Sequence, residues 1–101
     1  MAGTKKKQTK KTVKPGKELV ESVVEEFRVK LLKLVSQDIE ELSIDMKSVK
    51  DMDSSGLGIL IAAKNSFEQA GVRLNLKNVP ENIEGFIQVL GLDRYFELSA
   101  A

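Results

Sequence analysis

Residues 42–77 have the sequence LSIDMKSVKDMDSSGLGILIAAKNSFEQAGVRLNLK and decide the fold class of this 101-residue chain. Apolar and polar residues alternate over residues 42–47, and this period of two predicts a strand that ends near Val49. Residues 57–70 are first apolar and then amphipathic, which predicts a helix with Gly71 as its C-terminal cap. The alternation returns over residues 72–77. A strand, a helix and a second strand in this order indicate an α/β fold.

Helical periodicity flanks this unit on both sides. From Glu18 onward, apolar residues recur at i, i+3 and i+4 spacing, which predicts a helix that packs by one stripe. On the other side Pro80 opens a third helix, Gly91 ends it, and residues 92–98 form a last turn of helix or an edge strand. The whole order predicts one domain with a small open sheet covered by helices. The stripe of the first helix consists of Leu19, Val20, Val23, Val24, Phe27, Leu31, Leu34 and Val35.

The first 17 residues differ in composition from the rest of the chain. They contain seven lysines and no acidic residue, a charge of +7, so the net charge of +1 leaves −6 for the remainder. So little apolar surface predicts a disordered, solvated tail over residues 1–17 that ends at the turn signal Pro15-Gly16, followed by a folded domain over residues 18–101. Non-specific contact with phosphates of nucleic acid or of a membrane surface is the less favoured alternative, since no aromatic residue stands between the lysines.

Missing residue types exclude most kinds of chemistry. The chain has no cysteine, histidine or tryptophan, which removes disulfides, Cys/His zinc sites and the commonest general base. We therefore expect a protein that is not an enzyme and that needs no cofactor or metal. No apolar run approaches about 18 residues, and the N-terminal lysines precede no apolar stretch. The sequence thus predicts a cytoplasmic protein without a membrane span.

The connection before the central helix contains the candidate site. Asp53, Ser54 and Ser55 are all good N-cap residues, and they follow a strand at the edge where sites collect in open α/β sheets. A capped helix needs no function, so this spacing alone leaves a purely structural role open. A phosphate on a serine here would lie at the positive end of the helix dipole and meet free N–H groups. Beside Asp51 and Asp53, its charge of about −1.5 to −2 would repel a partner rather than melt the helix.

At these residues the chain resembles a known family. Residues 52–58, MDSSGLG, match the signature of STAS-domain anti-sigma factor antagonists, and this match is specific. The resemblance extends through residues 42–49, 71–74, 78–79 and 86–92, and it covers roughly residues 18–98. It implies the STAS fold and a bacterial regulator of transcription that works by protein–protein interaction.

The resemblance also implies a mechanism. In the family, the first serine after the aspartate, here Ser54, is phosphorylated by a serine kinase that is itself the anti-sigma factor. The unphosphorylated protein binds the kinase and frees the sigma factor, the phosphorylated form lets go, and a PP2C-type phosphatase resets the cycle. Asp53 would orient the acceptor, Ser55 would support the loop, and side chains at Gly56 or Gly58 would obstruct the partner or the neighbouring backbone. The partner-binding loop implied is Asp51, Met52, Asp53, Ser54, Ser55, Gly56, Leu57 and Gly58.

One region departs from the family pattern. The family begins with a β-hairpin that ends in a Gly-Glu-Leu-Asp-like turn, and here only residues 16–19, GKEL, resemble it faintly. The N-terminal strand or hairpin is therefore expected to be missing or reduced to residues 11–14. An exposed sheet edge left by that loss would support a homodimer.

Two rival interpretations stay open. A STAS-like docking subunit of a transporter or signalling assembly, without phosphorylation, would share the fold. A nucleotide-using enzyme is less favoured, because Gly56-Leu57-Gly58 completes no phosphate-binding motif. Asp45, Asp51 and Asp53 resemble a Mg²⁺ site only in residue type, and acidic residues around such a loop more often serve as caps and solvated charges.

Overall fold

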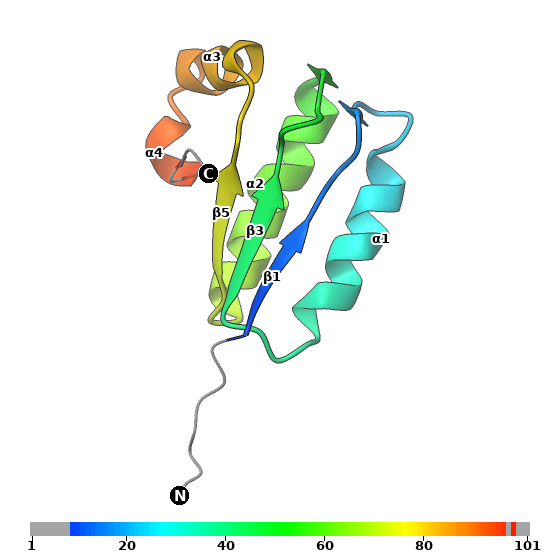
Figure 1. Cartoon of the computed structure of the whole chain (residues 1–101), viewed down its shortest axis with the longest axis vertical. Coiled ribbons are helices and arrows are strands. Elements are labelled where there is room, and N and C mark those ends of the chain that lie inside the picture. Colours follow the sequence, from blue (N-terminus) through cyan, green and yellow to red (C-terminus); the bar gives the residue numbers. More distant parts are fainter. Residues whose placement is uncertain (1–8, 97, 99–101) are drawn as a thin grey trace, which may run out of the picture.

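A three-stranded parallel sheet forms the centre of the molecule, as the computed structural model, which describes residues 9–96 and 98, shows (Figure 1). Its strands are β1 (Lys10–Val13), β3 (Glu41–Asp45) and β5 (Arg73–Lys77), in the order β1-β3-β5. The register places Val13 beside Ile44 and Ile44 beside Leu76. Partners in register point to the same face of a sheet, so Val13, Ile44 and Leu76 form an apolar row across the three strands.

A short second ladder extends the sheet at its carboxyl end. Strand β2 (Glu18–Leu19) pairs in parallel with β4 (Asp51–Met52), and each follows along the chain from a strand of the larger sheet. In Figure 1 this ladder lies at the top of the view, beside the start of the central helix. The carboxyl ends of the strands and the N-terminus of that helix therefore meet at one end of the molecule.

Four helices accompany the two ladders. Helices α1 (Val24–Val35) and α2 (Ser54–Gln69) are the crossovers between parallel strands, and they contact each other (Figure 1). Helix α3 (Glu81–Val89) follows β5, and α4 (Asp93–Phe96) packs against β5 at the edge opposite β1. A crossover helix after each buried strand is what the alternating sequence pattern predicts.

The core lies between the sheet and the helices. Burying one leucine or isoleucine side chain in such a core contributes roughly 1.5–3 kcal/mol to the stability of the folded state. Side chains on β3 are buried on both faces of the sheet, whereas those on β5 alternate between buried and partly exposed. The largest fully buried side chains are Phe67, Phe96, Leu19, Leu42, Ile44, Met46, Leu60, Leu74, Leu76 and Ile87.

The predicted first helix begins later than the periodicity indicated. Leu19 is a strand residue in β2, Val23 is the N-cap, and the helix starts at Val24. Leu19 is fully buried because it pairs with Met52 rather than because it belongs to a helical stripe. A few apolar residues fit a short strand followed by a turn as well as they fit a helix, so spacing alone could not separate the two.

The expected tail over residues 1–17 does not hold for residues 10–13, which form β1. The backbone N–H groups of Glu40 and Glu41 donate to the carbonyl of Thr9, and the pairing with β3 continues to Val13. Only Val13 of β1 is buried, and two of its other residues are lysines. The strand therefore lacks the apolar alternation on which the prediction was based. A reduced first strand was expected at residues 11–14 and lies one position earlier; residues 1–8 of the expected tail lie outside the described part of the chain.

Two further boundaries differ from the prediction. The strand predicted over residues 42–49 ends at Asp45, and a turn closed by the N–H of Val49 bonding to the carbonyl of Met46 leads into β4. The last segment is a helical turn, α4, whose Phe96 is fully buried, which resolves the choice left open between helix and edge strand. Gly71 ends the central helix as predicted, with a φ of 82° that favours glycine.

Candidate functional site

Asp53 fixes the start of helix α2. It is the N-cap residue, and its Oδ1 accepts a hydrogen bond of 3.0 Å from the N–H of Gly56. Its Oδ2 accepts a second bond of 3.0 Å, from the N–H of Glu21 in the segment before α1. Its own N–H donates to the carbonyl of Leu19 at 3.2 Å. One carboxylate thus ties the central helix to the β2–α1 segment, and of the three candidate caps the structure selects Asp53.

These bonds also set the protonation of Asp53. The N–H of Gly56, and after it the N–H of Glu21, hold the pKa of the Asp53 carboxyl below its ordinary value, since both bonds favour the charged form. A smaller contribution comes from the N–H of Ser55. The carboxylate is therefore ionised at neutral pH and neutralises the positive end of the helix dipole.

Ser54 is the first residue of α2 and is exposed. Its hydroxyl makes no hydrogen bond to any residue that the structure describes. Ser55 is half-buried, and its contribution to the loop is the backbone N–H near Asp53 rather than a side-chain cap. The two adjacent serines therefore differ in accessibility, and Ser54 is the more exposed of the two.

The two glycines of the site have different surroundings. A Cβ placed on Gly56 would lie 1.9 Å from the carbonyl oxygen of Leu19, which is backbone and cannot swing away. A Cβ on Gly58 would meet nothing within 4 Å, and Gly58 is exposed. The expected close approach of a neighbouring backbone is confirmed at Gly56. At Gly58 the chain itself requires no glycine, so the expected obstruction of a partner there remains a prediction.

Two acidic residues lie on the short ladder that precedes helix α2. Glu18 and Asp51 are partners in the β2–β4 register, and both are exposed. Asp45 lies apart from them: its Oδ1 accepts from Nδ2 of Asn78 at 3.1 Å and from the N–H of Lys47 at 3.0 Å. Within residues 9–96 and 98, no three potential ligands of the Asp, Glu, His or Cys type gather closely enough to hold a metal ion. Asp45 is thus the last residue of β3, its side chain fixes the turn that follows, and the structure does not bring it together with Asp51 and Asp53.

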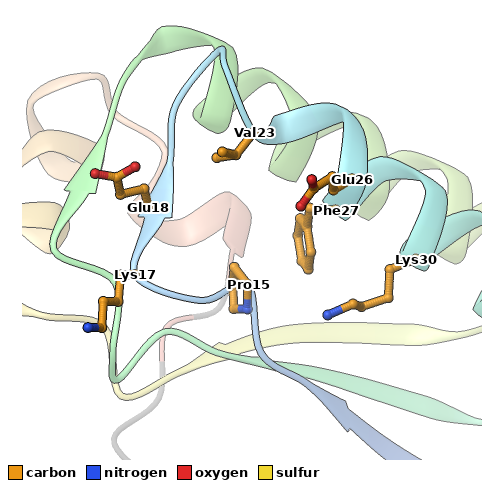
Figure 2. A pocket seen from close by; sticks show the side chains of 7 residues that line it. All are labelled: Pro15, Lys17, Glu18, Val23, Glu26, Phe27 and Lys30. Atoms are coloured by element: carbon orange, nitrogen blue, oxygen red, sulfur yellow. The ribbon is translucent and has the colours of Figure 1, made fainter.

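A hollow of about 470 Å³ lies beside the site, between the β1–β2 connection and the start of α1 (Figure 2). Figure 2 shows Pro15, Val23 and Phe27 around its apolar part and two lysines and two glutamates around them. Two lysines and two glutamates among the lining residues give the hollow a formal charge of zero. Its lining residues are Pro15, Lys17, Glu18, Val23, Glu26, Phe27 and Lys30.

The contacts of Leu19 and Glu21 with the site were not predicted from the sequence. Leu19 was assigned to the stripe of a helix, and Glu21 contributes only its backbone N–H, which no residue type encodes. The one available signal was the segment at residues 16–19, GKEL, which the family resemblance had already set apart.

No helix within the described residues is long and apolar enough to cross a membrane.

Comparison with known sequences gives a consistent result. A family model described as the STAS domain matches residues 4–101. The anti-sigma-B factor antagonist of Bacillus subtilis (strain 168) is 33% identical over 74 residues, which make up 73% of this chain and 67% of the relative.

Solved structures show the same fold at lower identity. The anti-sigma factor antagonist SpoIIAA in its unphosphorylated form superposes with a TM-score of 0.78 at 22% identity, covering 94% of this chain and 82% of the other. Bacillus SpoIIAA in the phosphorylated form gives 0.72 at 22% identity, covering 94% and 85%. The murine anion transporter Slc26a9 gives 0.81 at 21% identity over 96% of this chain but only 17% of its own.

Proposed function

This chain belongs to the STAS domain family, and on that premise we propose that it is a cytoplasmic anti-sigma factor antagonist switched by phosphorylation of Ser54. In this proposal the unphosphorylated protein binds an anti-sigma serine kinase and so frees a sigma factor. The kinase ends the interaction by transferring a phosphate to the Ser54 hydroxyl, and a PP2C-type phosphatase restores the starting state. The chain itself performs no catalysis in this cycle.

The observation that carries the proposal is the contrast between Ser54 and its neighbours. Asp53 and Gly56 are held in place by backbone contacts with the β2–α1 segment, whereas the Ser54 hydroxyl between them is exposed and makes no bond to the described residues. A fixed helix start presents an accessible acceptor in one orientation, which is what a kinase needs. The relative from Bacillus subtilis supports the functional class, and the two SpoIIAA structures support a family in which phosphorylated and unphosphorylated forms share one fold.

The charge of the site explains how phosphorylation would release a partner. The Gly56 N–H is already taken by Asp53, so a phosphate on Ser54 would share the helix N-terminus with a carboxylate rather than replace it. A phosphate on Ser54 would add about −1.5 to −2 of charge next to the ionised Asp53 and three residues after the exposed Asp51. A partner that buries the neutral hydroxyl loses that contact and must accommodate the added charge.

A docking subunit without phosphorylation is the second candidate. It is favoured by the likeness to the Slc26a9 transporter, whose chain contains this fold within a much larger protein. In that function the same end of the molecule would contact a permanent partner in a transporter or signalling assembly. The two candidates differ in one respect: only the first requires a phosphate that appears and disappears on Ser54.

Peptide mass spectrometry of the protein from its own cells, during growth and during stress, tests the proposal. We expect a phosphate on the peptide containing residues 53–58, assigned by fragmentation to Ser54 and not to Ser55, in a fraction that changes with the condition. A Ser55→Ala variant should keep the modification, and a Ser54→Ala variant should lose it. A stable complex with unmodified Ser54 under every condition would contradict the switch and support the docking subunit.

A further inference from the structure

The two edges of the central sheet are not equivalent. The edge at β5 is covered by α4, whereas β1 has β3 on one side and no strand on the other among the described residues. Lys10, Lys11 and Thr12 of this strand are all exposed. We propose that the outer edge of β1 binds an extended, acidic segment of another protein as an additional strand.

The pairing with β3 shows which backbone groups are free to bind such a segment. The carbonyl of Thr9 accepts from the N–H groups of Glu40 and Glu41, so Thr9 faces β3. Because N–H and C=O groups alternate in direction along a strand, Lys11 and Val13 face β3 as well, while Lys10 and Thr12 direct their backbone groups outward. An extended peptide laid along β1 would find donors and acceptors at the spacing of a β-ladder.

The charge of the edge selects an acidic partner. Lys10 and Lys11 make no ion pair with any described residue. The acidic neighbour of Lys10 in register is Glu41, and its Oε2 accepts from Nδ2 of Asn75 at 2.9 Å on the side away from β1. Opposite charges directly across a pair of strands are attractive, and each such pair contributes roughly 0.2–1 kcal/mol. Glutamates or aspartates on the added strand would therefore pair with these lysines.

Other occupants fit this edge less well. A second copy of the chain would bring the lysines of two β1 strands together, and lysines on an edge strand are a known obstacle to self-pairing. A nucleic acid or an anionic membrane would satisfy the charges, but neither offers the alternating peptide donors and acceptors that the outward groups of β1 require. The described part of the chain also has no aromatic residue before Phe27 on which bases could stack near this edge.

Amide NMR of the full chain tests the proposal, with a synthetic peptide that carries two adjacent glutamates between valines, so that one glutamate lies on each face of the added strand. We expect binding in the submillimolar range, with the largest shifts and a gain in hydrogen-exchange protection at the outward amides of Lys10 and Thr12. Lys11 and Val13, which already bond to β3, should change less. The same peptide with lysine in place of both glutamates should not bind.

Two variants separate strand addition from charge attraction. Thr12→Pro removes one outward N–H, a change that an edge strand tolerates, and should weaken the acidic peptide about tenfold. The double change Lys10→Glu and Lys11→Glu should weaken it about tenfold or more, while Lys47→Glu, an exposed lysine on the β3–β4 turn, should have no effect. If Thr12→Pro fails to fold, the comparison of the double change at Lys10 and Lys11 with the control change at Lys47 still tests the proposal.

Several results would overturn the proposal. Absence of peptide binding at millimolar concentration is one, and protection of the Thr12 amide in the free monomer is another. A dimer in sedimentation that protects Thr12 would assign the edge to a second copy. Tighter binding to an oligonucleotide or to anionic phospholipid vesicles, unaffected by Thr12→Pro, would assign the lysines to phosphate.

Discussion

The two long helices of this molecule begin in different ways. Helix α2 begins with a side-chain cap: Asp53 binds Gly56 within the helix and Glu21 outside it. Helix α1 has Val23 at its N-cap, no side-chain cap, and an exposed ion pair between Glu25 and Arg28 in its first turn. One start is fixed by the backbone of another segment, and the other is held by its own packing and surface charge.

This difference shows where the molecule needs precision. A fixed start positions whatever stands next to it, and at α2 that residue is Ser54. At α1 the first three residues are exposed or half-buried and only Phe27, the fourth, is buried, and nothing in the proposed function depends on their exact placement. Changing each helix start and measuring stability and binding tests this difference.

The largest effect is expected from Gly56→Ala. The added Cβ would lie 1.9 Å from the carbonyl oxygen of Leu19, so helix α2 must separate from β2. We expect a loss of about 3 kcal/mol in the free energy of unfolding, measured by urea denaturation. The matched control is Gly58→Ala, which meets no atom within 4 Å and should gain about 0.5–1 kcal/mol from helix propensity. Equal effects of the two changes would mean that the close contact at Leu19 is not a constraint.

Removal of the carboxylate at each helix start comes next. Asp53→Ala leaves the N–H groups of Gly56 and Glu21 without their acceptor, and we expect the Tm to fall by about 5 °C. Glu25→Ala removes only an exposed ion pair and should lower the Tm by about 2 °C or less. Differential scanning calorimetry measures both, and a fall of the same size for Glu25→Ala would contradict the contrast between the two helices.

Acid titration gives a smaller but specific effect. The folded-state pKa of Asp53 is lowered, so its contribution to stability is fully present above the unfolded pKa of about 3.9 and is lost as the pH falls through the folded value. Asp45, whose pKa is lowered first by the Asn78 side chain and then by the Lys47 N–H, acts in the same direction. Stability should be nearly constant from about pH 7 to pH 5 and fall below about pH 4.

Asp53→Asn checks the assignment of that loss. An amide cannot be protonated in this range, so the variant should be less stable at neutral pH and lose less on acidification. Urea denaturation at pH 7 and at about pH 3.5 measures the difference. An unchanged acid loss in Asp53→Asn would assign the pH dependence to other carboxylates.

The smallest effect on stability is expected at Ser54 itself. Its side chain is exposed and bonds to none of the described residues, so the Tm of Ser54→Ala should lie within about 2 °C of the Tm of the wild-type protein. A clear loss of stability would show that Ser54 has a structural role in the helix start and is not simply presented by it.

The same contrast explains which parts of the fold could be predicted. The start of α2 follows from Asp53-Ser54-Ser55 because capping is a local interaction between neighbouring residues, and Gly71 and Pro80 marked helix boundaries for similar local reasons. The predicted start of α1 was wrong for two reasons. No side-chain cap marks it, and Leu19, which fits the helical spacing, pairs with Met52 in another strand.

Contacts between distant segments limited the prediction of the site in the same way. That Gly56 needs to be small could be predicted, but that Leu19 is the neighbour depends on the parallel pairing of β2 and β4. Strand β1 was hidden because three of its four residues face solvent and two are lysines. Its existence depends on backbone bonds to β3, which residue types do not encode.

In the proposed switch the state of Ser54 determines partner binding, and affinity capture from the native cells measures this dependence most directly. Immobilised protein with serine, alanine or phosphoserine at position 54 would be compared for the serine kinase it retains. We expect the serine and alanine forms to retain the kinase equally and the phosphoserine form to retain at least roughly tenfold less, because the charge is placed in the interface. Equal retention by the phosphoserine form would contradict the switch.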